Sequence, residues 1–405
     1  MTSSRPRLYF DNAATSFPKP AEVAQAMMRQ LMETGASPGR GGYAEAIEAG
    51  RILTRCRDLI NKLIHGESAD HVVFTLHTTD ALNLAIKGIV HHHRQRGEKV
   101  HIVTTRMDHN SILRPMNAII HDGVEVTRIE VDPVSGRVNP DDIRAAIRPD
   151  TRLVATIHGS NVTGTLQPIS EIGAACRAME VPFLVDAAQT IGHLPIDVQT
   201  MNVDLLAFPG HKGLLGPLGT GGLYIRPGLE QRIDTLREGG TGTASERDVQ
   251  PDTMPDKFEP GSHNTPGIAG LAAGVKWILD RGVDSLWSDE KRLIDQMLAG
   301  LSGLPGLRLL GLPTSQNRCG VFSIVVDGIE PLDLAAILEE HYGILVRAGL
   351  HCAPLAHQTM GTASHGGATR FSLGPFLTED DVRTATNAVA EVCHEQTAAS
   401  PMTHA

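Results

Sequence analysis

The sequence of 405 residues contains few cysteines, no long hydrophobic run and no excess of positive charge. The five cysteines are scattered and form no C-x-x-C pair, which argues against a disulfide framework or a zinc site and favours reduced thiols. The first residues contain no apolar signal-peptide core, and no run is long enough to span a membrane. The net charge of -10 argues against nucleic acid or an anionic membrane surface as a partner. We therefore expect a cytoplasmic protein with neither kind of partner.

The sequence otherwise has the composition of a globular protein, with 41% hydrophobic and 20% charged residues. Short apolar runs alternate with helical segments of roughly 10 to 20 residues, a pattern typical of an α/β fold. It predicts an open, mostly parallel sheet of seven strands with helices on both faces. The apolar runs are 71–74, 99–103, 124–129, 153–157, 183–185, 205–208 and 222–225.

The pattern changes near residue 278. A helix over 284–302 precedes apolar runs at 307–310 and 321–326, a helix over 331–341, a short strand at 344–346 and a helix from Thr378. This order predicts a smaller α+β domain. We expect an N-terminal arm and a large cofactor-binding domain over 1–277, the small C-terminal domain over 278–395, and a disordered tail over 396–405.

Two strand ends carry the residues that point to a cofactor. Asp186 ends one apolar run, and Lys212 follows the next. In open α/β sheets, ligands bind beyond the carboxyl ends of the strands. Pyridoxal phosphate (PLP) requires a lysine for its covalent linkage and a carboxylate beside its pyridinium nitrogen. The sequence therefore predicts a PLP site at this edge of the sheet.

Other polar residues follow neighbouring strands. Thr78 and Thr79 open a helix and can supply hydroxyl and N–H groups to a phosphate, although an ordinary helix cap explains them as well. His109 is placed to stack on a pyridine ring, with a surface histidine as the alternative. Asn161 is placed to bind the phenolic oxygen of the cofactor or a substrate carboxylate, with a loop cap as the alternative.

Two further segments suggest sites that we do not predict. The run from His91 to His93 ends a helix and is interpreted as a solvated helix end, so no metal site is expected. The glycine-rich run at 216–222 precedes a strand, whereas a dinucleotide-binding loop would join a strand to a helix.

Cys352 lies between glycine and proline residues, which indicates an exposed loop, although cysteine is more often a small buried residue. The neighbouring Arg347 and His351 would favour its reactive thiolate form. Further along, Arg370 lies in an apolar setting where its guanidinium can hold a substrate carboxylate through two hydrogen bonds. A surface ion pair is the alternative for Arg370.

Taken together, these segments resemble the cysteine desulfurase and selenocysteine lyase family of class V, fold type I PLP enzymes. The resemblance runs from about Leu8 to Val392, with the family's motifs in order. These motifs are Tyr9-Phe-Asp-Asn-Ala-Ala-Thr15, Thr78-Thr79, Asp108-His109-Asn110, Ser160-Asn161-Val-Thr-Gly164, Asp186-Ala-Ala-Gln189, Gly210-His211-Lys212, Glu259-Pro-Gly-Ser-His-Asn264, Gly349-Leu-His-Cys352-Ala353 and Arg370-Phe-Ser372.

The resemblance implies a role for each of these positions. Lys212 would carry the cofactor and move protons, Cys352 would take the substrate's sulfur as a persulfide, and His109 would stack on the ring. The remaining cofactor ligands would be Thr78, Thr79, Asp186, Gln189, His211 and, from the partner of a homodimer, Ser262. The substrate carboxylate would meet Asn161 and Arg370, with Arg347 close by.

The chain departs from the family pattern at three positions. Pro209 replaces a phosphate-binding serine of many relatives, Ser262 replaces a threonine, and Leu350 replaces a histidine that some relatives have. None of these changes removes the expected chemistry. The function expected from the resemblance is desulfuration of L-cysteine to L-alanine, with the sulfur passed to a dedicated acceptor protein.

Several alternatives remain open at this stage. The first is a selenocysteine lyase acting on L-selenocysteine, and another is a different class V enzyme, such as a C–S lyase or a transaminase. A third is a sulfur-relay or assembly partner with little turnover of its own.

Overall fold

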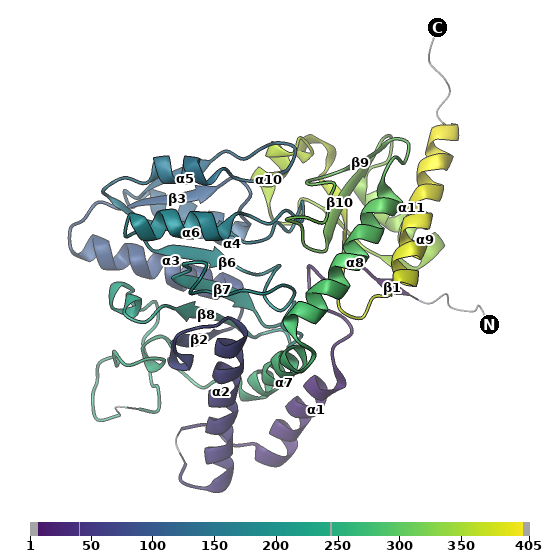
Figure 1. The fold of residues 1–405 in the computed structure, drawn as a ribbon. Helices are drawn as coiled ribbons and strands as arrows, with labels where there is room; N and C mark the ends of the chain where they lie inside the picture. The colour runs from purple at the N-terminus through teal and green to yellow at the C-terminus, as the bar shows by residue number, and fades with distance from the viewer. Residues whose placement is uncertain (1–6, 40, 244, 400–405) are drawn as a thin grey trace.

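The computed structural model describes residues 7–39, 41–243 and 245–399. Its centre is a seven-stranded sheet (Figure 1), whose strands lie in the order β2 (Val72–Thr75), β8 (Gly221–Ile225), β7 (Leu205–Pro209), β6 (Phe183–Asp186), β5 (Thr151–Ile157), β3 (His101–Thr105) and β4 (Glu125–Ile129). The four neighbouring pairs from β7 to β4 are parallel, and the pairs that involve β8 are antiparallel. The predicted α/β class and the mostly parallel sheet of seven strands are confirmed.

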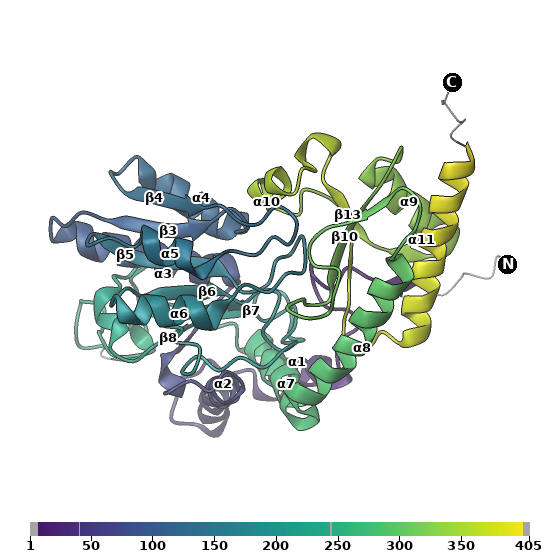
Figure 2. The same ribbon diagram turned by 45° about the horizontal axis from the view of Figure 1, so that its top comes forward.

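Helices cover both faces of this sheet, because every residue of β3, β6 and β7 is buried and needs cover on both sides. One face is covered by α5 (Pro140–Ala146) and α6 (Ile169–Ala178), and the other by α3 (Thr78–Gln95) and α4 (Asn110–Ile120), as Figures 1 and 2 show. At the β2 edge, α7 (Thr265–Arg281) packs against α1 (Ala21–Arg29) and α2 (Ala44–Leu63). This arrangement leaves the carboxyl ends of the parallel strands as the edge where a ligand can enter.

A second hydrophobic core lies in the C-terminal part of the chain. It contains a four-stranded antiparallel sheet in the order β12 (Arg347–Gly349), β13 (Ala368–Ser372), β10 (Val321–Val326) and β9 (Leu307–Leu309). The helices of this part are α8 (Val283–Leu301), α9 (Pro331–Tyr342), α10 (Pro354–Thr359) and α11 (Glu379–Ala399). Figure 1 shows α11 at the edge of the molecule away from the seven-stranded sheet, with α8 packed against it.

The N-terminal segment joins this second core, which the sequence did not predict. β1 (Leu8–Tyr9) pairs in parallel with β11 (Ile344–Leu345), and the fully buried Phe10 packs edge-on against Phe371 of β13. The next residue, Asp11, forms a bridge with Ser372. The segment after Phe10 is therefore fixed beside β13 before the chain enters the large sheet.

Two expectations need correction. α11 runs through Ala399, so residues 396–399 continue the helix and do not begin a disordered tail, while residues 400–405 lie outside the described part. His92 and His93 are buried, with their Nδ1 atoms 3.2 Å from Asp234 and 2.9 Å from Glu98, because carboxylates at the end of α3 give the imidazoles partners. The end of α3 is thus solvated at His91 and at residues 94–96, but not at His92 and His93.

The domain boundary expected near residue 278 stays a prediction, and the break between α7 and α8 is at Gly282. Within the described residues, no group of three or more histidine, cysteine or acidic side chains is arranged to hold a metal ion. The described helices include none that is long and apolar enough to cross a membrane.

Candidate active site

A cavity at the carboxyl ends of the parallel strands brings together eight of the residues singled out from the sequence. They are Thr78, Thr79, His109, Asn161, Asp186, Gln189, His211 and Lys212, and the rest of the lining is His77, Ser111, Ile157, Gly159, Ala188 and Pro209. These residues come from segments spread over more than a hundred positions of the chain. The topology of the sheet, which aligns the strand ends, explains their meeting.

The size of a cavity does not identify this site. The cavity at the strand ends measures about 120 Å³, whereas another, of about 230 Å³, lies between α7, α8 and the segment before α11. The larger cavity is lined by none of the residues that the sequence pointed to. Only the smaller one combines a desolvated lysine, a buried carboxylate and the start of a long helix.

Lys212 and Asp186 face this cavity from adjacent strand ends. Burial, with a smaller contribution from Arg370, lowers the pKa of the Lys212 amine to about 8. Burial raises the pKa of Asp186 to about 6, against the opposing effects of its hydrogen bond from Ala188 N at 2.9 Å and of the Lys212 charge. The neutral amine is therefore accessible near neutral pH, and the carboxylate is short of compensating partners. Both properties suit a ligand that takes the amine covalently and offers a cation to the carboxylate.

The opposite side of the cavity is formed by the starts of α3 and α4. His109 caps α4, since its Nδ1 accepts a hydrogen bond from Ser111 N at 3.0 Å. The Ser111 hydroxyl lies 3.0 Å from that Nδ1 and 2.8 Å from the Thr79 hydroxyl. Burial and the nearby Lys212 lower the pKa of His109 to about 3, so its ring is neutral. Thr78 and Thr79 are the first residues of α3, where the free N–H groups of a helix attract anions.

Three buried polar atoms around this site have no hydrogen-bond partner among the described residues. They are His211 Nδ1, Asn161 Oδ1 and Arg370 Nε. Buried polar atoms are nearly always paired, so a group of unpaired ones around a cavity indicates a polar ligand. A phosphorylated aromatic aldehyde such as PLP fits this set, because it brings a phosphate, a phenolic oxygen and a ring nitrogen to donors and acceptors of the required kinds.

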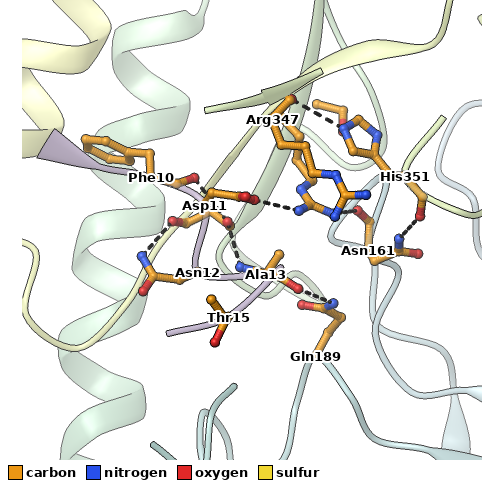
Figure 3. Close-up of polar contacts among 12 residues, drawn as sticks. Phe10, Asp11, Asn12, Ala13, Thr15, Asn161, Gln189, Arg347 and His351 are labelled. Carbon is orange, nitrogen blue, oxygen red and sulfur yellow. Dashed lines mark hydrogen bonds and ion pairs between the residues drawn. The ribbon is translucent and has the colours of Figure 1, made fainter. Parts of the chain in front are cut away.

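The two predicted carboxylate-binding residues, Asn161 and Arg370, lie together. Figure 3 labels Asn161 and also Asp11, the ion-pair partner of Arg370. Arg370, on β13, is 2% exposed and forms an ion pair with Asp11 at 2.8 Å. It also donates to the Asn161 carbonyl oxygen at 3.3 Å. The surface ion pair considered for Arg370 is therefore ruled out, because the guanidinium lies in the interior. Arg347 lies directly opposite Arg370 in the register of β12 and β13 and is exposed.

Gln189 connects the N-terminal segment to the site. Its Nε2 donates to the Ala13 carbonyl oxygen at 3.1 Å, so one of its two N–H groups is already used within the chain. The carbonyl oxygen of His211 accepts from Ser16 N and from Lys19 Nζ, both at 3.1 Å. The segment that follows Phe10 therefore holds the side chain of Gln189 and the backbone of His211.

Cys352 is exposed, as its flanking residues predicted, and its carbonyl oxygen accepts a hydrogen bond at 2.8 Å from the backbone N–H of Asn110, the residue after His109. The prediction that His351 favours the thiolate form of Cys352 is wrong. Burial and the Arg370 charge lower the pKa of His351 to about 2, so this ring is neutral and offers no positive charge to the thiol. Arg347 is the remaining cation in the segment around Cys352.

Ser262 does not line this cavity. It is exposed and borders two other hollows of the surface, close to Arg237 and Thr241. Its segment is held by Glu259, which is paired with Arg57 at 2.6 Å and bonded to His263 at 2.6 Å. Ser262 of the same chain is therefore not among the residues that line the Lys212 cavity.

Two residues of the site had no role in the sequence analysis. Asp11 stands in the Tyr9–Thr15 motif, but nothing in the sequence links it to Arg370, which is 359 positions away. Ser111 follows His109 by two residues, and a hydroxyl at a helix start beside a strand end was the signal that would have identified it.

Comparisons with known proteins agree with this geometry. The family model "Aminotransferase class-V" matches residues 8–384. A probable cysteine desulfurase of Methanothermobacter thermautotrophicus is 34% identical over 391 residues, which cover 96% of this chain and 95% of that protein. Another, of Pyrococcus abyssi, is 35% identical and covers 85% of each chain. The apo structure of a cysteine desulfurase from Thermococcus onnurineus superimposes with a TM-score of 0.88 at 32% identity, over 96% of this chain and 95% of that one.

Proposed function

The chain belongs to the aminotransferase class-V family, and we propose that it is a PLP-dependent cysteine desulfurase, which moves the sulfur of L-cysteine to Cys352 and releases L-alanine. The observation that carries the proposal is a combination of three features: Lys212 and Asp186 line one cavity, the Arg370 charge acts on Lys212, and the exposed Cys352 is bonded to the residue after His109. A class V transaminase would need the lysine and the carboxylate but would have no use for the cysteine.

In this proposal the cofactor is held at five points. Lys212 bonds it covalently, Asp186 pairs with the ring nitrogen, and His109 lies against the ring. Gln189 donates to the phenolic oxygen, and the phosphate lies at the start of α3 with Thr78, Thr79 and His211. PLP, when bound, withdraws electrons from the amino acid and so weakens the bonds at its Cα and Cβ. Pro209 gives the phosphate no donor, so the phosphate depends on the remaining groups.

The other residues act on the substrate. Arg370 and Asn161 bind the carboxylate, with Arg347 near the entrance, and the neutral amine of Lys212 takes the proton from Cα. The Cys352 thiolate then attacks the substrate's sulfur. An S–S bond forms and the Cβ–S bond breaks; Cβ then takes up a proton, and the protonated Lys212 returns one to Cα to give alanine. Covalent capture of the sulfur divides one difficult step into two easier ones.

The experiment that tests the function is alanine release from L-cysteine by the purified enzyme with a reductant present. We expect wild type to release alanine and Cys352→Ala to lose at least roughly 10³-fold in rate, since the nucleophile is gone. Lys212→Ala should lose the visible absorption band of bound PLP. The control is Cys319→Ala, which removes a fully buried thiol and leaves the rate close to wild type.

Other outcomes would contradict the proposal. Alanine from L-selenocysteine alone would make the protein a selenocysteine lyase. Pyruvate, or an amino-group transfer that Cys352→Ala leaves intact, would indicate a C–S lyase or a transaminase. Little turnover until an acceptor protein is added would indicate a relay role. A normal visible band in Lys212→Ala would overturn the assignment of the cofactor.

We further propose that the enzyme is a homodimer in which Ser262 completes the phosphate site of the partner. A cluster of apolar side chains supports a contact with another copy. Met28, Leu31 and Met32, at the end of α1 and in the π-helical turn Gln30–Thr34, are 62–82% exposed. Tyr43 and Ile47, at the start of α2 against which that turn packs, are 56% and 46% exposed. Large exposed apolar side chains on two packed segments favour a contact with another protein.

Met32→Glu tests the dimer. A charge placed in the apolar cluster should convert the dimer to a monomer by light scattering and reduce the PLP content, because each site then lacks the partner's hydroxyl. Val134→Glu, which changes an equally exposed apolar residue in the loop between β4 and α5, should remain dimeric. A wild-type monomer with full PLP occupancy would exclude this arrangement.

Two features support the handing on of sulfur. Cys352 is exposed, so a persulfide on it is within reach of an acceptor protein. The other four cysteines are free and buried, so they do not compete for the sulfur. A reactive thiol of this kind requires a reducing compartment, and we place the enzyme in the cytoplasm.

A further inference from the structure

The reactive cysteine lies in a turn whose backbone conformation is unfavourable. His351 and Cys352 both have positive φ, at 49° and 56°, and Ala353 N donates to the Leu350 carbonyl oxygen at 2.9 Å. Two central residues with positive φ and this hydrogen bond match a type I′ turn, which normally contains asparagine and glycine. Residues with a Cβ adopt this conformation at a cost in free energy and keep it only where surrounding contacts impose it.

The contacts that impose it come from the large sheet. The Asn161 Nδ2 atom donates to the His351 carbonyl oxygen at 2.6 Å, and the backbone N–H of Asn110 donates to the Cys352 carbonyl oxygen at 2.8 Å. Each of the two strained residues thus has its carbonyl oxygen held from outside the turn. Figure 3 shows the Asn161 side chain reaching the His351 carbonyl.

Asn161 is also part of the cavity. It is 6% exposed, it lines the cavity with Lys212, and its own carbonyl oxygen accepts from Arg370. Asn161 therefore contacts both the turn that carries the nucleophile and the Arg370 guanidinium, which we propose binds the substrate carboxylate. Its Nδ2 has a second N–H, so holding the turn leaves one donor for a ligand.

We propose that Asn161 is a positioning residue for Cys352: its side-chain amide holds the strained turn, and so fixes the thiol relative to the carboxylate site. This proposal rests on the proposed function and deepens it, because it adds a task to a residue that sequence reasoning gave to the carboxylate alone. Asn110 holds the turn through its backbone N–H, which a substitution does not remove. Asn161 holds it through its side chain, so a substitution at Asn161 does remove this contact.

The test measures the turn in the absence of substrate. In the PLP-loaded enzyme, Asn161→Ala should exchange the Ala353 amide hydrogen roughly tenfold faster than wild type, as expected for the loss of one good hydrogen bond. Asn161→Asp should behave in the same way, since a carboxylate has the size of the amide but cannot donate to the His351 carbonyl oxygen. With L-cysteine, both variants should lose kcat as well as affinity, because the thiol is no longer held in place.

Arg370→Lys is the matched control. It weakens carboxylate binding and should raise KM, but it should leave exchange at Ala353 at the wild-type rate. If Asn161→Ala does not retain PLP, Asn161→Asp carries the test, with the visible band and circular dichroism as checks of folding. Unchanged exchange at Ala353 in the folded variants would overturn the proposal. If wild type releases no alanine while the exchange difference persists, the proposed function fails and Asn161 still anchors the turn.

Discussion

At the scale of single residues, two buried aspartates at the same edge of the sheet differ in the number of hydrogen bonds that they accept. This difference separates a structural carboxylate from a ligand-binding one. Burial raises the pKa of both Asp108 and Asp186 to about 6. Asp108 accepts hydrogen bonds from the hydroxyls of Thr104 and Thr105 and from the N–H groups of Thr105 and Ile157. Asp186 accepts one, from Ala188. The chain therefore satisfies Asp108 itself and leaves Asp186 for a cationic partner.

We predict that Asp186→Asn makes the cofactor-free protein more stable at pH 8. A carboxyl group whose pKa is raised by folding contributes stability below its unfolded value of 3.8 and loses that stability as the pH rises through about 6. At pH 8 the resulting penalty is on the order of 2–3 kcal/mol, and the neutral amide removes it. Urea unfolding at pH 8 and at pH 4 should show a gain that shrinks toward acid.

Asp108→Asn is the control for this measurement. The amide cannot accept all four hydrogen bonds, which costs about 1–3 kcal/mol. Because burial also raises the pKa of Asp108, the net loss should be largest at pH 4. Asp186→Asn should also bind PLP in a form with little activity, since an amide does not stabilise a positive ring nitrogen. Equal losses of stability in the two variants would show that Asp186 is a structural group.

At the element scale, a buried chain of hydrogen bonds ties the Cys352 turn to α10 and the loop after it. The Thr362 hydroxyl lies 2.7 Å from His357 Nδ1, His357 Nε2 lies 3.4 Å from His351 Nδ1, and His351 Nε2 lies 3.3 Å from the Arg347 carbonyl oxygen. That carbonyl oxygen only accepts, which makes His351 Nε2 a donor and sets the direction of every other bond. These directions hold for neutral rings, and burial keeps both rings neutral by lowering the pKa of His351 to about 2 and that of His357 to about 4.

Thr362→Val should break this chain at its start. The valine keeps the shape but leaves His357 Nδ1 buried without a donor, which costs about 1–3 kcal/mol. Thermal unfolding of the PLP-loaded enzyme measures the loss. Thr359→Val, at the partly exposed end of α10, should change stability by less than about 0.5 kcal/mol. A similar midpoint in the two variants would mean that the hydrogen-bond chain adds no stability.

The site also shows what a sequence can and cannot predict. Lys212, Asp186 and His109 follow apolar runs, and the parallel order of strands places such residues at one edge, so local patterns were sufficient. The pairing of Asp11 with Arg370 depends on β1, β11 and β13 coming together, which no local pattern records. The burial of His92 and His93 depends on the carboxylates that the fold brings to them. The conformation of the Cys352 turn is likewise imposed by Asn161 and Asn110 from distant elements.

At the scale of the whole molecule, the N-terminal segment connects the two hydrophobic cores. Phe10 belongs to the second core, whereas the residues that follow it bond to Gln189 and to the carbonyl oxygen of His211 at the edge of the large sheet. The cavity therefore lies where three parts of the chain meet, and its geometry depends on the stability of both cores.

The titratable groups of the whole chain also decide how the protein responds to acid. Burial lowers the pKa of seven histidines, namely His93, His101, His109, His158, His211, His351 and His357. Among the described carboxylates and histidines, three groups have raised pKa values and act in the opposite direction, namely Asp108, Asp186 and His193. The histidines whose pKa is lowered outnumber the groups whose pKa is raised.

We therefore predict that the cofactor-free protein loses stability as the pH falls from 7.5 to 5.5. A histidine whose pKa is lowered by folding contributes stability above its unfolded value of 6.5, and this stability is lost as the pH falls toward the folded value, because the unfolded chain takes up the proton first. Each such histidine changes the free energy of unfolding by at most about 1.4 kcal/mol per pH unit. Urea unfolding at several pH values gives the slope of the free energy of unfolding against pH, which counts the protons taken up on unfolding. His357→Gln should reduce this number by up to one proton. A slope that is flat over this range would mean that these histidines are protonated in the folded protein, and their neutral hydrogen-bond assignments would then be wrong.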